Sequence, residues 1–274
     1  MHRFFAAMFG TMLLVHPGLA LKASAAGKPN VVVMLADNLG YGDVGAYGAG
    51  EIRGMPTPNL DKLAAEGLRF TQFLVEPGCT PSRAGLMTGR YSIRSGLSKI
   101  ILRGTPNTLK AEEVTLAELF KSQDYRTAYM GKWHLGSDEE SQPQNQGFDE
   151  WRFGFFGTTE ATLYGESMAR TKAPKKWQAL IPQIIEADHA RGPVKPVQDY
   201  DLEYRRFVDR DISNAATNFI KTHAGSETPF FLFLGWTRPH YPNDAAPDYH
   251  GKSRIGSYGD SVMELDGRTG EVLA

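Results

Sequence analysis

The sequence predicts a doubly wound α/β fold, in which helices cover both faces of a mostly parallel sheet. Continuous apolar segments alternate along the chain with segments of helical periodicity, and this alternation is typical of that class. Polar side chains directly follow three of the predicted strands, and such sheets bind their ligands where strands end. Neither an internal repeat nor a linker divides the chain, so we expect one domain over residues 27–274.

The first predicted elements are a strand, a helix and a second strand. Residues 31–35 form an apolar, β-branched run that is typical of a strand buried on both faces. A helix is predicted to begin with Pro58 at its first position, after Thr57 as N-cap, and to end at Gly67. The apolar residues 68–74 predict a short strand.

Two helices are predicted next. After a turn rich in Pro and Gly, the first begins at Pro81 or Ser82. The second begins after Thr115, because Thr115 and Glu118 have the spacing of a capping box, and it continues to about residue 123.

The rest of the chain predicts two strands and a long helix. Residues 126–130 form a short strand, whereas residues 151–198 are rich in Gly, Pro and Lys and predict an irregular insertion near a binding face. Apolar residues at helical spacing predict a helix over residues 202–223, and residues 229–234 predict a further buried strand. The polar residues that follow strands are Asp37 and Asn38, Lys132 and His134, and His240.

Composition excludes two broad classes. The 274 residues include 30 Lys and Arg and 31 Asp and Glu, which gives a formal net charge of -1. A nucleic-acid-binding protein would need a strong basic excess, and 41% hydrophobic residues exclude wholesale disorder. The single cysteine, Cys79, can form neither an internal disulfide nor a CxxC metal site.

Residues 1–26 are typical of a secretory signal peptide. They contain a basic start, an apolar run over residues 4–15 and small residues at the cleavage position, Ala23-Ser24-Ala25. The run is too short to span a bilayer comfortably, so we expect no stable membrane insertion and a secreted or periplasmic protein. An uncleaved amphipathic anchor is the alternative interpretation.

Residues 40–45 match the dinucleotide-binding pattern GxGxxG and follow a predicted strand. That pattern needs a helix immediately after it, with the pyrophosphate at the helix N-terminus. The chain instead continues through further glycines to Pro56, which a helix tolerates poorly. We therefore interpret the match as accidental.

Cys79 is the strongest candidate for a nucleophile. A lone cysteine is most often a small buried hydrophobic residue. Here Cys79 lies where a helix is predicted to begin, with Arg83 one turn along. A nucleophile beside a positive helix end and a guanidinium suits a phosphate-like or sulfate-like group.

Residues 79–89, Cys-Thr-Pro-Ser-Arg-Ala-Gly-Leu-Met-Thr-Gly, resemble the signature of the sulfatase family, C-x-P-S-R-A-x-L-x-T-G, at every specified position. The resemblance extends over nearly all of residues 28–274. It includes Gly-Tyr-Gly-Asp-Val-Gly at 40–45, Thr-Pro-Asn-Leu-Asp at 57–61, Gly-Lys-Trp-His-Leu-Gly at 131–136 and Arg-Pro-His at 238–240. It implies an alkaline-phosphatase-like α/β fold and a sulfuric ester hydrolase of arylsulfatase type.

The resemblance also implies a role for each matching residue. A formylglycine-generating or sulfatase-maturing enzyme would oxidise Cys79 to formylglycine, whose hydrate attacks sulfur and is later regenerated as the aldehyde. His134 would be the base, Arg83 and Lys132 would hold formylglycine and neutralise the sulfate, and His240 would bind sulfate and help protonate the leaving oxygen. Taken alone, Lys132 and His134 could be a solvated loop pair, and His240 a polar loop residue.

The implied metal ligands are Asp37, Asn38 and the modified Cys79. Carboxylate and amide oxygens suit Ca²⁺, and Mg²⁺ is the alternative. The family usually has Asp where this chain has Asn38, which lowers the charge of the site by one. Without the resemblance, Asp37-Asn38 could equally form an Asx turn.

The family's later metal ligands and a further active-site Lys would lie beyond residue 274. We therefore expect the C-terminal part of the catalytic domain to be missing, and this chain to be weakly active or inactive. The alternatives are a phosphonate or phosphodiester hydrolase that uses the same formylglycine, and a non-catalytic product that retains a sulfate-binding face. Aryl, carbohydrate and alkyl sulfates all remain possible substrates.

Overall fold

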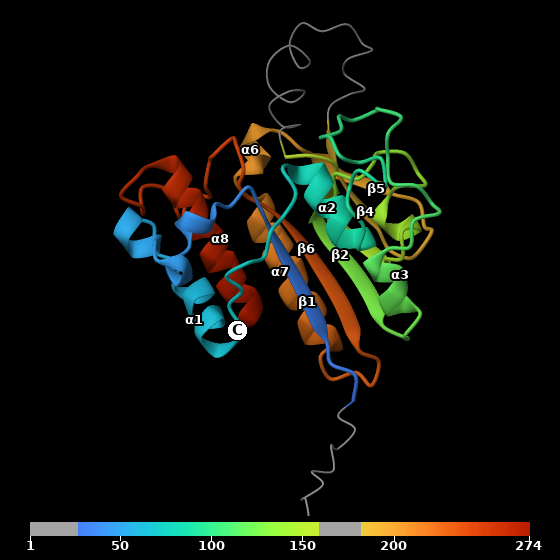
Figure 1. Cartoon of the computed structure of the whole chain (residues 1–274), viewed down its shortest axis with the longest axis horizontal. Helices are drawn as coiled ribbons and strands as arrows, with labels where there is room; N and C mark the ends of the chain where they lie inside the picture. Colours follow the sequence, from blue (N-terminus) through green and yellow to red (C-terminus); the bar gives the residue numbers. More distant parts are fainter. Residues whose placement is uncertain (1–26, 159–181) are drawn as a thin grey trace, which may run out of the picture.

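The structure is a computed structural model that describes residues 27–158 and 182–274. The predicted signal peptide lies outside these residues. The described part contains a six-stranded sheet in the order β1-β6-β2-β3-β4-β5 (Figure 1). Its strands are β1 (Val31–Asp37), β2 (Arg126–Lys132), β3 (Glu150–Phe155), β4 (Gln183–Ala187), β5 (Lys195–Asp199) and β6 (Phe230–Pro239).

Strands β1, β6, β2 and β3 are parallel, and β4 and β5 extend the sheet in antiparallel pairs. The carboxyl ends of β1, β6 and β2 therefore lie at one edge of the sheet, as the sequence predicts.

Helices cover both faces of the sheet (Figure 1). Side chains of β6 alternate between two apolar clusters: Phe231 and Phe233 belong to one, and Leu232 and Leu234 to the other, because successive residues of a strand point to opposite faces. The first cluster contains residues of α2 (Cys79–Thr88) and α3 (Leu116–Lys121), and the second contains residues of α7 (Val208–His223) and α8 (Ser257–Leu273).

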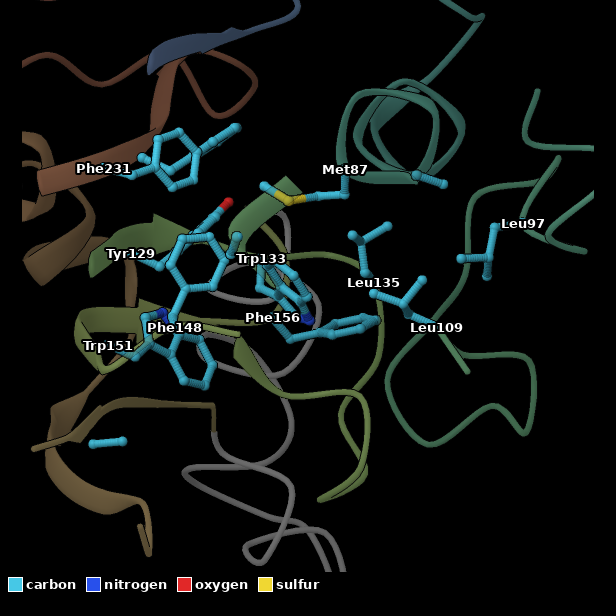
Figure 2. Close-up of a cluster of buried hydrophobic side chains, with 14 of the residues drawn as sticks. Met87, Leu97, Leu109, Tyr129, Trp133, Leu135, Phe148, Trp151, Phe156 and Phe231 are labelled. Atoms are coloured by element: carbon cyan, nitrogen blue, oxygen red, sulfur yellow. The ribbon is translucent and has the colours of Figure 1, made fainter. Parts of the chain in front are cut away.

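Aromatic rings fill the cluster beneath α2 and α3 (Figure 2). The Tyr129 ring stacks on Phe233 with centroids 5.0 Å apart, and it meets Trp133 and Phe148 edge-on, at 5.1 Å from each. Trp133 and Phe148 are completely buried. This packing fixes the end of β2, which carries Lys132 and His134.

Two predicted helix starts are confirmed. Helix α1 (Pro58–Glu66) has Pro58 in its first turn. At α3, the Thr115 hydroxyl accepts a hydrogen bond from the Glu118 amide at 3.2 Å, and the Glu118 carboxylate accepts one from the Thr115 amide at 2.7 Å. This is the predicted capping box. Helix α2 begins at Cys79, two residues before the earlier of its two predicted starts.

No α-helix follows the GxGxxG match. Residues 40–53 form three short 3-10 turns, η1 (Tyr41–Asp43), η2 (Gly45–Tyr47) and η3 (Gly50–Arg53). The interpretation of the match as accidental is therefore confirmed.

Three predictions about secondary structure are wrong. Residues 68–74 form no strand, because no neighbouring strand pairs with them, and Leu68 and Leu74 are 88% and 90% exposed. The irregular insertion over residues 151–198 contains β4, β5 and most of β3; residues 159–181 of it lie outside the described residues.

The predicted helix over residues 202–223 is divided into α6 (Leu202–Arg205) and α7. At the division, the amides of Arg206 and Phe207 bond three residues back, to the carbonyls of Glu203 and Tyr204, at 3.4 and 2.8 Å. This tighter turn interrupts the α-helical hydrogen bonding.

Within the described ranges, every helix is too short or too polar to cross a membrane.

Candidate active site

The candidate site lies at the carboxyl edge of three neighbouring strands. Asp37 ends β1, Lys132 ends β2 and His240 follows β6. Because these strands are parallel and adjacent, their ends bring the three side chains together. One potential ligand atom each from Asp37, Cys79 and His240 lies within 4.8 Å of the others.

The Asp37 carboxylate is buried among cations and hydroxyl groups. Its Oδ2 atom accepts hydrogen bonds from Lys132 Nζ and Thr158 Oγ1, both at 2.6 Å, and its Oδ1 lies 3.9 Å from Arg83 Nη2. Burial by itself would raise the pKa of this carboxyl group. The charges of Lys132, Arg83 and His240 outweigh burial and hold the pKa well below its usual value. Asp37 is therefore ionised in the folded protein.

Cys79 is the first residue of α2 and lies against the β1 end. Its Sγ is 3.4 Å from Asp37 Oδ1 and 3.8 Å from Asn38 Oδ1. The preceding Gly78 has φ 126°, a conformation that side-chain-bearing residues rarely adopt. Burial raises the pKa of the Cys79 thiol, against the opposing effect of Lys132. The unmodified thiol is therefore protonated near neutral pH and is a weak nucleophile.

Arg83 lies one turn along α2 and reaches across the sheet surface. Its Nη1 donates to the Lys132 carbonyl at 2.9 Å and to the Tyr129 hydroxyl at 3.3 Å. Burial raises the pKa of Tyr129 to about 12, so that hydroxyl keeps its proton, which it donates to the same carbonyl.

Two neighbouring glycines leave room at the ends of β2 and β6, and one of them, Gly235, adjoins Arg83. A Cβ atom added at Gly235 of β6 would lie 2.4 Å from the Lys132 carbonyl oxygen and 3.1 Å from Arg83 Nη1. A Cβ atom at Gly131 of β2 would lie 2.3 Å from the Gly235 carbonyl oxygen. Only glycine fits at either position without a backbone shift.

His134 lies at the same edge but bonds away from Asp37. Its Nε2 lies 3.0 Å from the Ile101 carbonyl oxygen, which can only accept, so Nε2 carries the proton. The Ile101 amide donates to the Thr80 hydroxyl of α2 at 3.2 Å. One peptide segment thus connects His134 to the residue after Cys79.

The other nitrogen of His134, Nδ1, is buried, and within residues 27–158 and 182–274 it has no hydrogen-bond partner. Burial and the charges of Lys132 and Arg83 lower the pKa of His134 to about 3. The imidazole is therefore neutral, and its Nδ1 keeps a lone pair that can accept a proton, although a pKa this low makes it a weak base.

A ring nitrogen of His240 lies within 4.8 Å of ligand atoms of Asp37 and Cys79. Its Nδ1 lies 2.5 Å from the Tyr241 carbonyl oxygen, so Nδ1 carries the proton and Nε2 is the acceptor. Burial lowers the pKa of His240, although the charge of Asp37 acts in the opposite direction.

Asp37 and Asn38 offer the kind of donor that Ca²⁺ prefers. Their Oδ1 atoms both face Cys79, and Asn38 has the left-handed backbone conformation, with φ 64°. Asp37 Oδ2 is already bonded to Lys132 and Thr158. The described residues therefore fit Ca²⁺ in donor type and supply part of the six to eight oxygens that it takes.

The structure brings six of the seven predicted site residues into one cluster: Asp37, Asn38, Cys79, Arg83, Lys132 and His240. The seventh, His134, joins it through Ile101. Sequence reasoning missed Thr158, Tyr129 and the Ile101 carbonyl. Thr158 follows β3, so the rule that identified Asp37 would have identified Thr158 if that strand had been recognised.

Comparison with known proteins gives one consistent result. The sequence model of the Sulfatase family matches residues 29–274. Arylsulfatase A of Bos taurus is 38% identical over 269 residues, which cover 93% of this chain and 50% of that protein. N-acetylgalactosamine-6-sulfatase of Mus musculus is 34% identical, and the alignment covers 96% of this chain and 50% of that protein.

A solved structure agrees with these sequence matches. The crystal structure of PsFucS1 sulfatase from Pseudoalteromonas sp. has a TM-score of 0.80 and 35% identity, over 90% of this chain and 51% of that chain. The present chain thus spans about half the length of the relatives it matches. Its sheet and helices are part of the alkaline-phosphatase-like fold that sulfatases have. On the family match over residues 29–274 and this agreement in structure, the chain belongs to the sulfatase family.

Proposed function

We propose that this protein hydrolyses sulfate monoesters, with a formylglycine derived from Cys79 as nucleophile. The observation that carries the proposal is the position of Cys79, at the start of α2 and within 4 Å of both Asp37 and Asn38. The buried, protonated thiol is a poor nucleophile as it stands. Formylglycine supplies, once hydrated, a hydroxyl that can attack sulfur and a second one whose proton can later be removed.

The chain's own residues supply charge and proton transfer. Lys132 and Arg83 place two positive charges beside Asp37, where they can offset the charge of a sulfate group. We assign the role of base to His134, whose Nδ1 is unprotonated. His240 has a ring nitrogen within 4.8 Å of Cys79 Sγ and is the candidate for binding the sulfate and transferring a proton to the leaving oxygen.

We further propose that Ca²⁺ binds to Asp37 and Asn38. The ion supplies a positive charge that polarises the sulfate oxygens. Asn38→Asp would add one negative charge and is expected to increase Ca²⁺ affinity by at least tenfold, as measured by calorimetry. Equal affinities of the two proteins would contradict the assignment, and Asp244→Asn is a control outside the site.

The activity test uses Cys79. Co-expression with a formylglycine-generating enzyme should convert the Cys79 thiol to the aldehyde, which mass spectrometry of the peptide detects. Turnover of nitrophenyl sulfate should then disappear in Cys79→Ala and in wild-type protein made without the maturing enzyme. Full activity in either of these two proteins would show that formylglycine at position 79 is not the nucleophile. Preference for a nitrophenyl phosphonate ester would favour the phosphonate hydrolase, and an unmodified thiol after co-expression would favour a non-catalytic product.

We also propose export of the protein before or during maturation, on the basis of residues 1–26. N-terminal sequencing of the secreted protein tests this: a start near residue 27 is expected, and a start at Met1 would contradict it.

A further inference from the structure

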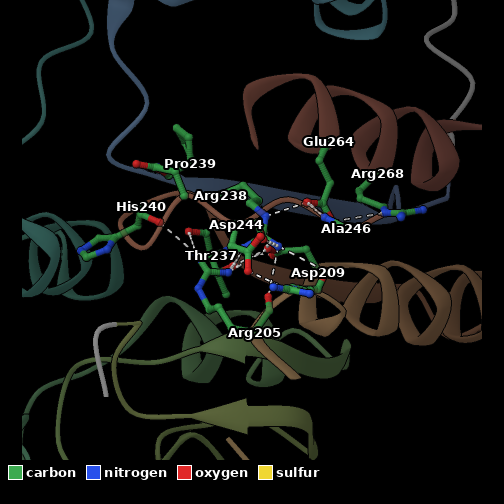
Figure 3. Close-up of polar contacts among 12 residues, drawn as sticks. Arg205, Asp209, Thr237, Arg238, Pro239, His240, Asp244, Ala246, Glu264 and Arg268 are labelled. Carbon is green, nitrogen blue, oxygen red and sulfur yellow. Dashed lines mark hydrogen bonds and ion pairs between the residues drawn. The ribbon is translucent and has the colours of Figure 1, made fainter. Parts of the chain in front are cut away.

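A cluster of buried charges lies beneath the turn that carries His240 (Figure 3). It contains Arg205 of α6, Asp209 of α7, Arg238 of β6 and Glu264 of α8, and none of these side chains is more than 1% exposed. Burying charged groups is costly unless they are paired and hydrogen-bonded. Two guanidinium groups and two carboxylates balance here, so the cost is offset by contacts within the cluster.

Arg205 makes the contacts that reach His240. Its Nη2 donates to the carbonyl oxygens of His240 and Thr237, at 3.0 and 3.2 Å, and its Nη1 donates to the Thr237 hydroxyl. The His240 amide donates to the same Thr237 carbonyl at 3.1 Å. The guanidinium group therefore holds both ends of the four-residue turn from Thr237 to His240.

Asp209 fixes the first residue of this turn. Its Oδ1 accepts a hydrogen bond from the Thr237 amide at 2.8 Å, and its Oδ2 accepts one from the Thr237 hydroxyl. Arg205 and Asp209 thus bond every polar group of Thr237. The turn cannot shift without breaking buried hydrogen bonds to charged groups, which are among the strongest in proteins.

The other half of the cluster holds the chain after His240. Arg238 Nη2 donates to the Asp244 carbonyl at 3.0 Å, and Glu264 Oε2 accepts from the Ala246 amide at 2.9 Å and from Arg238 Nε at 2.7 Å. Arg205 thus bonds the His240 carbonyl itself, whereas Arg238 bonds the segment after His240 and also the Arg205 carbonyl, at 3.1 Å.

The imidazole of His240 points away from this cluster (Figure 3). Its Nδ1 is bonded to the next carbonyl, of Tyr241, so the position of the backbone sets the position of Nε2. We propose that Arg205 is a positioning residue for His240: by holding the turn from Thr237 to His240, it sets where the imidazole lies beside Asp37 and Cys79. That Arg205 positions His240 follows from these contacts alone. Only the effect of Arg205 on catalysis rests on the proposed function.

The first test needs no turnover. Nitrogen-15 NMR of the histidine side chains reports the tautomer of His240, whose signals are identified by their loss in His240→Gln. We expect the wild-type protein to show the Nδ1–H tautomer. Arg205→Met should shift the ring signals and mix the two tautomers, because the Tyr241 carbonyl no longer stays in place.

The matched control is Arg268→Met. Arg268 of α8 is also a buried arginine paired with acids, at 2.6 Å from Glu271, 3.0 Å from Asp248 and 3.8 Å from Glu264, but among the described residues it forms no hydrogen bond with residues 237–240. This variant should leave the His240 signals unchanged. If Arg205→Met is folded and its His240 signals match those of the wild-type protein, the proposal is wrong.

A second variant covers the case in which Arg205→Met does not fold. Arg205→Lys keeps the buried charge, but an ammonium group cannot reproduce the planar fork that binds two carbonyls. We expect it to fold and to shift the His240 signals in the same direction by a smaller amount. Wild-type signals in folded Arg205→Lys would equally overturn the proposal.

The second test is a double-mutant cycle on matured enzyme. Arg205→Met should lower kcat by roughly 10²-fold, the size of loss expected from a small misplacement of a catalytic group. The loss should be greater for an alkyl sulfate than for nitrophenyl sulfate, because a poor leaving group depends more on protonation. In a His240→Ala background the same change should cost almost nothing further, because its effect passes through His240.

Equal losses in both backgrounds would mean that Arg205 acts only on stability, and this would contradict the proposal. If the chain shows no sulfatase turnover, the proposed function is in question while the NMR test still decides the role of Arg205. The failures of the two proposals are therefore distinguishable.

Discussion

His134 links protonation to the stability of the folded protein. Its pKa is about 3 in the folded state, against the ordinary value of 6.5. Between these values the unfolded chain binds a proton that the folded chain does not bind. The free energy of unfolding therefore falls as the pH is lowered through about 6.5 toward 3.

We expect His134→Gln to reduce this acid sensitivity by up to about 1.4 kcal/mol per pH unit, because glutamine does not titrate. Urea unfolding at about pH 7, pH 6 and pH 5 measures the slope. His189→Gln, at an exposed position, is the control and should retain the wild-type slope. Identical slopes for wild-type protein and His134→Gln would show that His134 titrates alike in the folded and unfolded states, against the lowered pKa.

At the scale of single residues, sequence motifs identified side chains but not the backbone that orients them. Cys79, Lys132 and Asp37 could be selected because their residue types carry chemistry. The Ile101 carbonyl could not, because every residue has one and only the tertiary fold decides which carbonyl meets His134. Arg205 was missed for a similar reason: its partners lie 32 and 35 residues away in sequence.

At the scale of elements, the cap of α3 stabilises the helix that covers the aromatic cluster. Thr115 is completely buried, accepts the Glu118 amide and donates to the Gln146 carbonyl at 2.8 Å. Thr115→Ala removes both bonds and leaves a buried carbonyl without a donor. We expect a loss of about 2 kcal/mol in the free energy of unfolding.

Thermal or urea unfolding measures this loss, and Thr115→Ser is the matched variant because it keeps the hydroxyl. It should remain within about 0.5 kcal/mol of the wild-type protein. If Thr115→Ser lowers the free energy of unfolding as much as Thr115→Ala does, the stabilisation comes from the threonine methyl group and not from the cap.

Elements that are determined by nearby residues in the sequence were predicted correctly. Elements that depend on pairing with another strand were not. The capping box of α3 and the proline of α1 act within a few residues, so sequence alone indicates where these helices begin. Residues 68–74 have the composition of a strand but no strand beside them. In β5, Lys195 and Pro196 are not typical of a strand, so the local sequence does not indicate one. This strand forms because it pairs with β4.

At the scale of the whole molecule, one edge of the sheet carries exposed apolar surface. Among the described strands, β1 pairs only with β6. Beside it lies a hollow of about 580 Å³. Its apolar lining includes Leu35, Phe73, Leu74 and Val75, the last three of which are at least 67% exposed. Unpaired strand edges and apolar patches of this kind promote association.

We therefore expect this chain to self-associate with increasing concentration, as measured by sedimentation velocity. A Phe73→Ser, Leu74→Asp variant should shift the distribution toward monomer. Ile52→Asp should have little effect, because Ile52 is 85% exposed but does not line the hollow. A sedimentation coefficient that is independent of concentration would contradict the expectation.

The paired glycines at 131 and 235 also constrain how this chain can evolve. Every change at the first or second base of a glycine codon introduces another residue or a stop, and a Cβ at either position would meet a backbone oxygen at 2.4 Å or less. Neither glycine carries a functional group, yet Gly235 leaves room for Arg83 beside the Lys132 carbonyl, and Gly131 leaves room for the backbone of Gly235. Selection on these two codons should therefore be as strict as on the codon of Cys79.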